Sequence, residues 1–326
     1  MSEYDFDVNT NDVKEQQNEH ISDTKVVAAS AIKEEVKREK TNSSYDTSKL
    51  VPNIPEGNVP FIVLCGPPNS GKSMVLKCLA SYLYNHENLN YAIEANETLL
   101  PTQKYQDDCK EFNRLIGLTD EKMPNTVDYL MADVTDEKGD VVAHFLEAPG
   151  EDFFSLDNLD EEPKREFKSY LDKIAQTTSK TRRKVIYIIL LDLDTKCSVK
   201  TATGSTHETT FRIDPNLRRT YQDKMKKLYN RYVPHSSNRV ILLYNKADVP
   251  KDGKWASPNG CLNLPAITQD AKKNYPGLFF KEKKLFWEVD ACTFLPFCTG
   301  SYADGSYIAS GPNYSAELWK EITRLW

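Results

Sequence analysis

Apolar runs and helical stripes alternate along the chain after residue 60. The segments 61–65, 185–191 and 240–244 are continuously apolar, which is typical of strands buried on both faces of a parallel sheet. Apolar residues recur at helical spacing in the segments between and around these runs. The predicted helices cover residues 74–84, 102–117, 160–175, 214–232 and 315–326.

Three further segments complete the expected sheet. Residues 127–135 and 141–146 predict two strands joined by a tight turn at "DEKG" (136–139), and the apolar segment "LFWEV" (285–289) predicts the last strand. We therefore expect a three-layer α/β fold with a mostly parallel six-stranded sheet and one antiparallel edge hairpin. Ligands of such sheets bind at the carboxyl ends of the strands.

The polarity of the chain also predicts its domain organisation. Residues 1–50 are polar and charged, so they predict a disordered tail. Residues 51–60, with three prolines, predict a stiff linker. The domain is then expected at 61–326, with insertions at 86–126 and 195–213.

Composition narrows the classes of function. The 326-residue chain has a net charge of −6, which gives no electrostatic reason to expect a nucleic-acid partner. Its longest apolar run, "VIYIILL", is too short for a transmembrane segment, and the amino-terminal residues lack the apolar core of a signal peptide. Seven scattered cysteines without a CxxC pair fit a reduced compartment, so we expect a cytoplasmic protein.

The segment "GPPNSGKS" (66–73) fits the pattern G-x-x-x-x-G-K-[ST] at every defined position. In this pattern glycines let backbone N–H groups point into one concavity, the lysine reaches the β- and γ-phosphates, and the hydroxyl binds Mg²⁺. The alternative is a simple Gly/Pro turn. Because a buried strand precedes the segment and a helix follows it, a phosphate site is favoured. The predicted nucleotide contacts are Gly66, Asn69, Ser70, Gly71, Lys72, Ser73 and Met74.

The segment "NKAD" (245–248) directly follows the apolar run 240–244. A carboxylate in the plane of a purine accepts hydrogen bonds from guanine N1–H and its exocyclic amine, whereas adenine would leave that acceptor unpaired. The stem of Lys246 can lie against the purine face. An Asn/Asp turn at a strand end is the alternative interpretation. Downstream of a phosphate loop, Asn245, Lys246 and Asp248 predict a guanine site.

With these two motifs, the chain resembles the Ras-like P-loop GTPases of the translation-factor-related class over residues 61–326. The resemblance implies GTP or GDP as the ligand and Mg²⁺ as the cofactor. It also implies a short backbone contact to the guanine after the last strand. The segment "EVDAC" (288–292) is similar to that element and places Ala291 against the base carbonyl.

The resemblance is weaker at the switch elements. Where these GTPases carry D-x-x-G, this chain has Glu147 to Gly150, which implies a water-mediated Mg²⁺ contact from Glu147 and a γ-phosphate contact from Gly150. The literal D-x-x-G at 136–139 falls in the predicted turn, where Asp and Gly are ordinary residues. Glu151 stands where a glutamine usually orients water, and a Gly-Glu pair here is similar to bacterial double-GTPase proteins.

The first switch requires a threonine that closes the Mg²⁺ shell. Thr126 is the best-placed candidate, with Thr98 and Thr102 as rivals. The segment "TRRK" (181–184) is interpreted as a solvated turn rather than an arginine finger. The resemblance thus implies metal contacts from Ser73, Thr126 and Glu147, and catalytic roles for Lys72, Gly150 and Glu151.

The favoured hypothesis is an Mg²⁺-dependent GTP-binding switch with slow GTP hydrolysis, read by a protein effector or regulator that the sequence does not identify. A second hypothesis is a pseudo-GTPase scaffold without significant hydrolysis. The glutamates at positions 147 and 151 favour this hypothesis. A third is a P-loop ATPase or kinase, which would leave "NKAD" without a role.

Overall fold

The computed structural model describes the chain from residue 54 onward, with gaps. The predicted tail and residues 51–53 and 56 of the predicted linker lie outside the described residues. The described residues are 54–55, 57–67, 70–93, 103–116, 130–150, 165–181, 183–191, 195–200, 206–211, 215–233, 239–245, 264–284, 287–303, 306–309 and 313–326.

The chain divides into two units. The smaller unit combines Met1–Asp46 with Val199–His207, and its described residues belong to two strands that form a two-stranded sheet. These strands are β6 (Thr195–Lys200) and β7 (Thr206–Phe211). The larger unit comprises Thr47–Ser198 and Glu208–Trp326, and it contains the main sheet.

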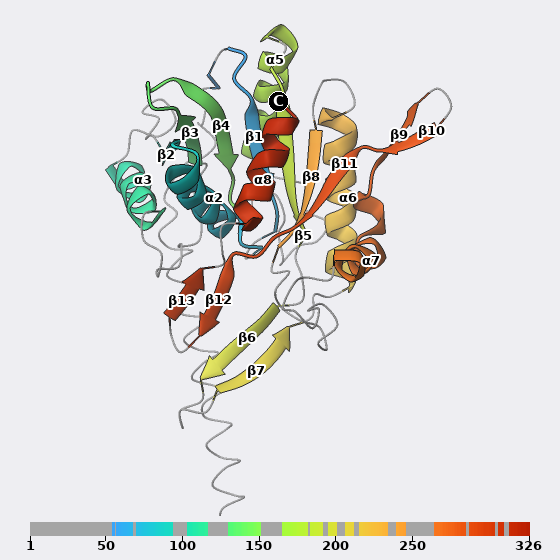
Figure 1. Ribbon diagram of the computed structural model, residues 1–326. Helices are drawn as coiled ribbons and strands as arrows, with labels where there is room; N and C mark the ends of the chain where they lie inside the picture. Colours follow the sequence, from blue (N-terminus) through green and yellow to red (C-terminus); the bar gives the residue numbers. More distant parts are fainter. Residues whose placement is uncertain are drawn as a thin grey trace, which may run out of the picture. The chain divides into compact units, whose positions relative to one another are not determined.

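Seven strands form one mixed sheet in the order β11-β8-β5-β1-β4-β3-β2 (Figure 1). All neighbours are parallel except β3, which is antiparallel to both β4 and β2. The central strands β1 and β5 are buried at every residue, as their unbroken apolar runs predict. The strands are β1 (Phe61–Cys65), β2 (Asn90–Ile93), β3 (Leu130–Thr135), β4 (Val141–Glu147), β5 (Val185–Leu191), β8 (Arg239–Tyr244) and β11 (Cys292–Pro296).

Helices cover both faces of this sheet, which gives the expected three layers. Helices α2, α3 and α8 share a hydrophobic cluster with one face of the sheet, and α2 and α8 lie side by side in front of it in Figure 1. Helices α5, α6 and α7 share a second cluster with the other face. The helices are α2 (Lys72–His86), α3 (Gln103–Ile116), α5 (Arg165–Thr181), α6 (Pro215–Tyr232), α7 (Leu264–Asn274) and α8 (Asn313–Arg324), with a 3₁₀ turn at Pro276–Leu278.

Two predictions about the sheet are wrong. The sheet has seven strands instead of six, because Asn90–Ile93 adds an edge strand inside the expected insertion, beside the antiparallel β3. The last strand of the sheet is β11, not 285–289. Residues 287–290 instead form β10 (Trp287–Asp290), which pairs antiparallel with β9 (Lys281–Lys284) in a separate two-stranded sheet. A third small sheet pairs β12 (Gly300–Ala303) with β13 (Ser306–Ala309).

The turn predicted at "DEKG" joins β3 to β4. The Asp136 side chain accepts hydrogen bonds from the backbone N–H groups of Lys138 and Asp140, at 2.9 Å each. Gly139 has φ +85°, a left-handed conformation that favours glycine. Asp136 and Gly139 are therefore turn residues, and the interpretation of this D-x-x-G as a turn is confirmed.

Arg183 corrects the interpretation of "TRRK" as a solvated turn. Its side chain is fully buried, and its guanidinium donates hydrogen bonds to the carbonyl oxygens of Pro55 (2.5 Å) and Gly57 (3.1 Å). Burial lowers the pKa of Arg183 from its ordinary value. Ile54, the residue before Pro55, is also buried in the core. Part of the predicted linker is thus fixed to the domain.

Candidate functional site

The backbone turns sharply between β1 and α2. The N–H of Ser70 donates to the Pro67 carbonyl (3.2 Å), and Gly71 takes a left-handed conformation at φ +89° just before the helix begins at Lys72. Ser70 is completely buried. The helix therefore starts inside the predicted phosphate loop and directs the positive end of its dipole into it.

Both loop glycines stand where a side chain would collide. A Cβ at Gly71 would lie 2.5 Å from the Asn245 Nδ2 atom, and one at Gly66 would lie 2.6 Å from the Ser70 Oγ atom. The backbone of this loop therefore needs glycine for space at both positions. At Gly71 it also needs glycine for its positive φ.

Lys72 is folded back over the loop. Its side chain is only 7% exposed, and its Nζ atom donates to the carbonyl oxygens of Gly66 (3.2 Å) and Pro67 (3.3 Å). The Lys72 ammonium therefore lies at the same loop as the first backbone N–H groups of α2. This arrangement concentrates positive charge and hydrogen-bond donors, which is the chemistry that an anionic phosphate requires.

Ser73 and Glu147 meet at the carboxyl end of β4. The Ser73 Oγ atom donates to the Glu147 Oε1 atom at 2.5 Å, although the residues are 74 positions apart in the chain. Glu147 is 1% exposed. The two residues predicted as metal ligands on the helix and on β4 thus lie together, and both present oxygen atoms, the ligand type that Mg²⁺ prefers.

Asn245 joins the end of β8 to the phosphate loop. Its Nδ2 atom donates to the Ser70 carbonyl oxygen at 2.8 Å, in a fully buried contact. The Asn245 Oδ1 and Ser70 Oγ atoms are buried and have no hydrogen-bond partner among the described residues. Buried polar atoms without partners are costly, so they indicate a place where a polar ligand or water completes the contacts.

The structure does not bring Ala291 to this site. Ala291 precedes β11, whose first residue Cys292 pairs with Val240 near the start of β8. It therefore lies at the amino end of the strand, about 16 Å along the strand from the carboxyl end where the loop lies. The prediction for Ala291 is wrong because the last strand of the sheet was placed too early in the sequence.

The segment that does follow the last strand at the carboxyl end is Phe297–Thr299. The Phe297 N–H donates to the Tyr244 carbonyl at 2.8 Å, which places this buried segment beside the end of β8. The Cys78 thiol, on α2, donates to the Thr299 carbonyl at 3.5 Å. The sequence signal was the run "CTFLP" (292–296), which is less apolar than the run "LFWEV" (285–289) before it.

Two further predicted site residues are described: Gly150 is buried three residues after Glu147, and Met74 is buried in the first turn of α2. The remaining predicted site residues lie outside the described residues, so their roles stay predictions. They are Asn69, Thr126, Glu151, Lys246 and Asp248, together with the rival threonines Thr98 and Thr102.

Burial raises the pKa of two groups near the loop. Burial raises the pKa of the Cys65 thiol to about 12, opposed in part by Lys72, so Cys65 stays protonated at neutral pH. Burial, and then the charges of Glu147 and Asp133, raise the pKa of Tyr91 on β2 well above its usual value. Sequence reasoning missed Tyr91 as a neighbour of Glu147 because β2 itself was not predicted.

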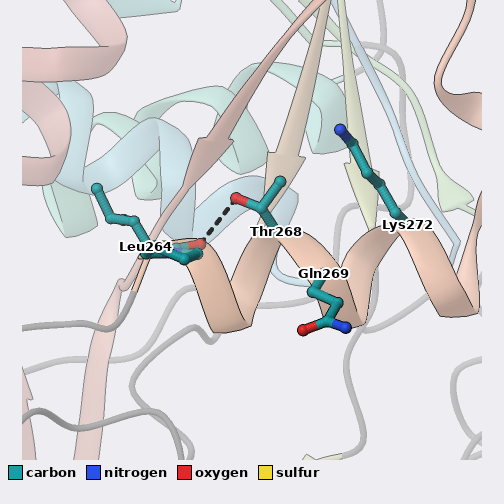
Figure 2. Close-up of a pocket in the computed structure, with 5 residues that line it drawn as sticks. Leu264, Thr268, Gln269 and Lys272 are labelled. Atoms are coloured by element: carbon teal, nitrogen blue, oxygen red, sulfur yellow. Dashed lines mark hydrogen bonds between the residues drawn. The ribbon is translucent and has the colours of Figure 1, made fainter.

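Other candidate features are sparse in the described part of the chain. It contains no cluster of three or more His, Cys, Asp or Glu side chains that could hold a metal ion. Within the same residues, no helix is long and apolar enough to cross a membrane. Figure 2 shows an open depression lined by Leu264, Pro265, Thr268, Gln269 and Lys272, all from α7. It is formed by one helix and shares no residue with the phosphate loop.

Comparisons with known proteins give structural likenesses only. The sequence matches no protein family and no curated protein. Solved structures similar to this chain include nucleolar GTP-binding protein 1 from Plasmodium falciparum (13% identity, covering 84% of this chain and 90% of that one, TM-score 0.33). They also include the GTP-bound Ski7 GTPase-like domain from S. cerevisiae (15%, 83% and 50%, TM-score 0.35) and a septin GTPase domain from Chlamydomonas reinhardtii (12%, 83% and 95%, TM-score 0.37). At these TM-scores the likenesses do not establish a function for this chain.

Proposed function

We propose that this chain binds GTP and GDP together with Mg²⁺, and that it acts as a Ras-like molecular switch with slow GTP hydrolysis. The observation that carries the proposal is the hydrogen bond from Asn245 to the Ser70 carbonyl (2.8 Å). It joins the loop that suits phosphates to the strand end that carries "NKAD". This contact supports a single site made of the phosphate loop and the segment that begins at Asn245.

The proposed roles follow from chemistry and position. Lys72 and the N–H groups at the start of α2 hold the β- and γ-phosphates. Asp248 accepts hydrogen bonds from guanine, and the stem of Lys246 covers its face. Gly150 contacts the γ-phosphate, and Glu151 orients the water for hydrolysis.

Mg²⁺ fits the residues present. The described residues supply one hydroxyl, Ser73, and one carboxylate, Glu147, which lie within hydrogen-bond distance of each other. This small donor set suits Mg²⁺, which takes one or two protein oxygens together with substrate phosphates and water. We assign Ser73, Glu147 and Thr126 to this role. When bound, the ion neutralises charge on the phosphates.

Glu147→Gln is expected to raise the Mg²⁺ concentration needed for half-maximal retention of GDP by about 10-fold or more. The amide is nearly isosteric and still accepts the Ser73 hydrogen bond, but it has no charge for the cation. The measurement is dissociation of fluorescent GDP across a Mg²⁺ series. Asp133→Asn, on the adjacent strand, is the matched control, and an unchanged Mg²⁺ profile in the Glu147 variant would contradict the assignment.

The base carbonyl needs a new partner in place of Ala291. We propose that the backbone of residues 298–299 contacts it, because this segment follows β11 at the carboxyl end of the sheet. Its neighbour Phe297 is held to Tyr244 at the end of β8 (2.8 Å). The segment lies beside the strand that leads into "NKAD".

A scaffold that binds GTP without hydrolysing it is the second candidate. The observation that favours it is the buried carboxylate of Glu147 bonded directly to Ser73, one methylene longer than the usual aspartate. Glu151 adds a second negative charge near the γ-phosphate. Single-turnover hydrolysis that is slow but lost in Lys72→Ala would exclude this candidate. The proposal of a switch also includes a protein effector or regulator that recognises its nucleotide state. It further includes membership of the translation-factor-related or double-GTPase groups of Ras-like GTPases.

The test is a competition experiment. Fluorescent GTP with Mg²⁺ is titrated onto the protein and displaced by GTP, GDP or ATP, with Asp248→Ala measured alongside. We expect guanine nucleotides alone to compete, and the variant to lose guanine preference by about 100-fold or more. Equal competition by ATP would overturn the guanine assignment, and absence of binding would overturn the phosphate site.

A further inference from the structure

Tyr244 is the last residue of β8 and is completely buried. Its hydroxyl donates to the Asp270 Oδ2 atom at 2.6 Å, and Asp270 lies on α7. The hydrogen bond therefore ties the carboxyl end of β8, the strand next to the edge strand β11, to a helix on one face of the sheet. None of the proposed nucleotide contacts uses it.

Asp270 is itself fixed by a chain of hydrogen bonds. The Asn274 Nδ2 atom donates to Asp270 Oδ2 (2.9 Å), and the Arg218 guanidinium on α6 donates to Asn274 Oδ1 (3.0 Å). Arg218 also lies over the Tyr275 ring, 5.4 Å from its centre. The acceptor of the Tyr244 hydroxyl is thus held from two helices.

The backbone around Tyr244 holds the two segments proposed to contact guanine. Its carbonyl accepts the Phe297 N–H (2.8 Å), at the start of the 297–299 segment. The next residue, Asn245, donates to the phosphate loop and begins "NKAD". A shift of the Tyr244 backbone therefore acts on Phe297 and on Asn245 together.

We propose that Tyr244 and Asp270 are a positioning pair that sets how tightly and how selectively the site holds guanine nucleotides. The inference rests on the proposed function. The hydroxyl anchors the strand end to α7, so that the base-reading segments keep one register relative to the phosphate loop. Burial, reinforced by Asp270, raises the pKa of Tyr244, so the phenol remains a donor at physiological pH.

The pair has a consequence beyond stability. Helix α7 follows the segment that contains "NKAD" in the chain, and Asp270 connects it back to the strand that precedes "NKAD". Helix α7 is thus connected to the motif along the chain and, through Asp270, at the strand end that precedes the motif.

The test uses Tyr244→Phe, which removes only the hydroxyl. Tyr232→Phe is the matched control. Tyr232 lies in the same core cluster as Tyr244, at the end of α6, and its hydroxyl also donates to an aspartate (Asp172, 2.8 Å). We expect Tyr244→Phe to release fluorescent GDP about 3- to 10-fold faster, which corresponds to one hydrogen bond. Asp270→Ala should reproduce the effect, and the double variant should add nothing further.

A second readout separates positioning from general softening. Inosine diphosphate differs from GDP only in lacking the exocyclic amine, so the ratio of the two affinities reports the placement of Asp248. We expect this ratio to shrink in Tyr244→Phe and to stay unchanged in Tyr232→Phe. Equal effects of the two variants, or additive effects of Tyr244→Phe and Asp270→Ala, would overturn the inference but leave GDP binding intact. A wild-type protein that binds no GDP would instead overturn the proposed function, and the inference with it.

Discussion

Replacing Lys72 with alanine is expected to weaken GTP and GDP binding by at least about 100-fold. Lys72 is only 7% exposed, and its ammonium is already held at the loop by two carbonyl oxygens. It is thus pre-positioned for phosphate oxygens, and hydrogen bonds between charged groups contribute roughly twice as much as neutral ones. Alanine removes these contacts and the positive charge at once.

The measurement is a titration with fluorescent GDP, combined with thermal unfolding of the nucleotide-free protein. Because Lys72 serves the ligand more than the core, the unfolding midpoint should move by less than about 5 °C. Lys320→Ala, an exposed lysine on α8, is the control and should bind normally. Binding of GDP by Lys72→Ala at near wild-type affinity would remove the phosphate loop from the proposal.

Gly71→Ala is expected to carry the second-largest effect, because it damages the loop and its connection to β8 together. Gly71 has φ +89°, which costs a non-glycine residue about 1–3 kcal/mol. Its new Cβ would also lie 2.5 Å from the Asn245 Nδ2 atom and displace that atom from the Ser70 carbonyl. The lost hydrogen bond adds about 1 kcal/mol.

We expect Gly71→Ala to lower the free energy of unfolding by about 2–4 kcal/mol and to weaken nucleotide binding by more than about 10-fold. Gly139→Ala is a close control: Gly139 has φ +85°, but a Cβ there meets nothing within 4 Å. That variant has the backbone strain without the clash. If both variants lose the same stability and both bind nucleotide normally, the contact between Gly71 and Asn245 has no role in the site.

The central strands were predictable because their burial on both faces leaves a continuous apolar run, as in β1 and β5. The sheet edges were not. Strand β2 has four residues of mixed polarity, and β11 is only half-buried, so neither carries a strong apolar signal. Residues 285–289 are more apolar than β11, and apolarity alone cannot tell which segment joins the sheet.

The candidate site likewise combines features that the sequence could predict with contacts that it could not. The spacing in "GPPNSGKS" could predict that Lys72 and Ser73 lie at the loop, because one short segment builds the whole loop. The contact of Ser73 with Glu147 could be expected from the strand end alone. The contacts of Asn245 with Ser70 and of Tyr244 with Asp270 join segments that are 175 and 26 residues apart, and no local pattern encodes them.

The buried guanidinium of Arg183 also decides where the self-sufficient part of the chain begins. Its acceptors are the Pro55 and Gly57 carbonyl oxygens, 128 and 126 residues earlier, and Ile54 fills a place in the core beside them. A shortened chain that starts at Phe61, where the apolar pattern begins, would leave an interior cation without acceptors and an empty apolar site. The smallest autonomous version of this domain must therefore keep the proline-containing segment from Ile54 onward.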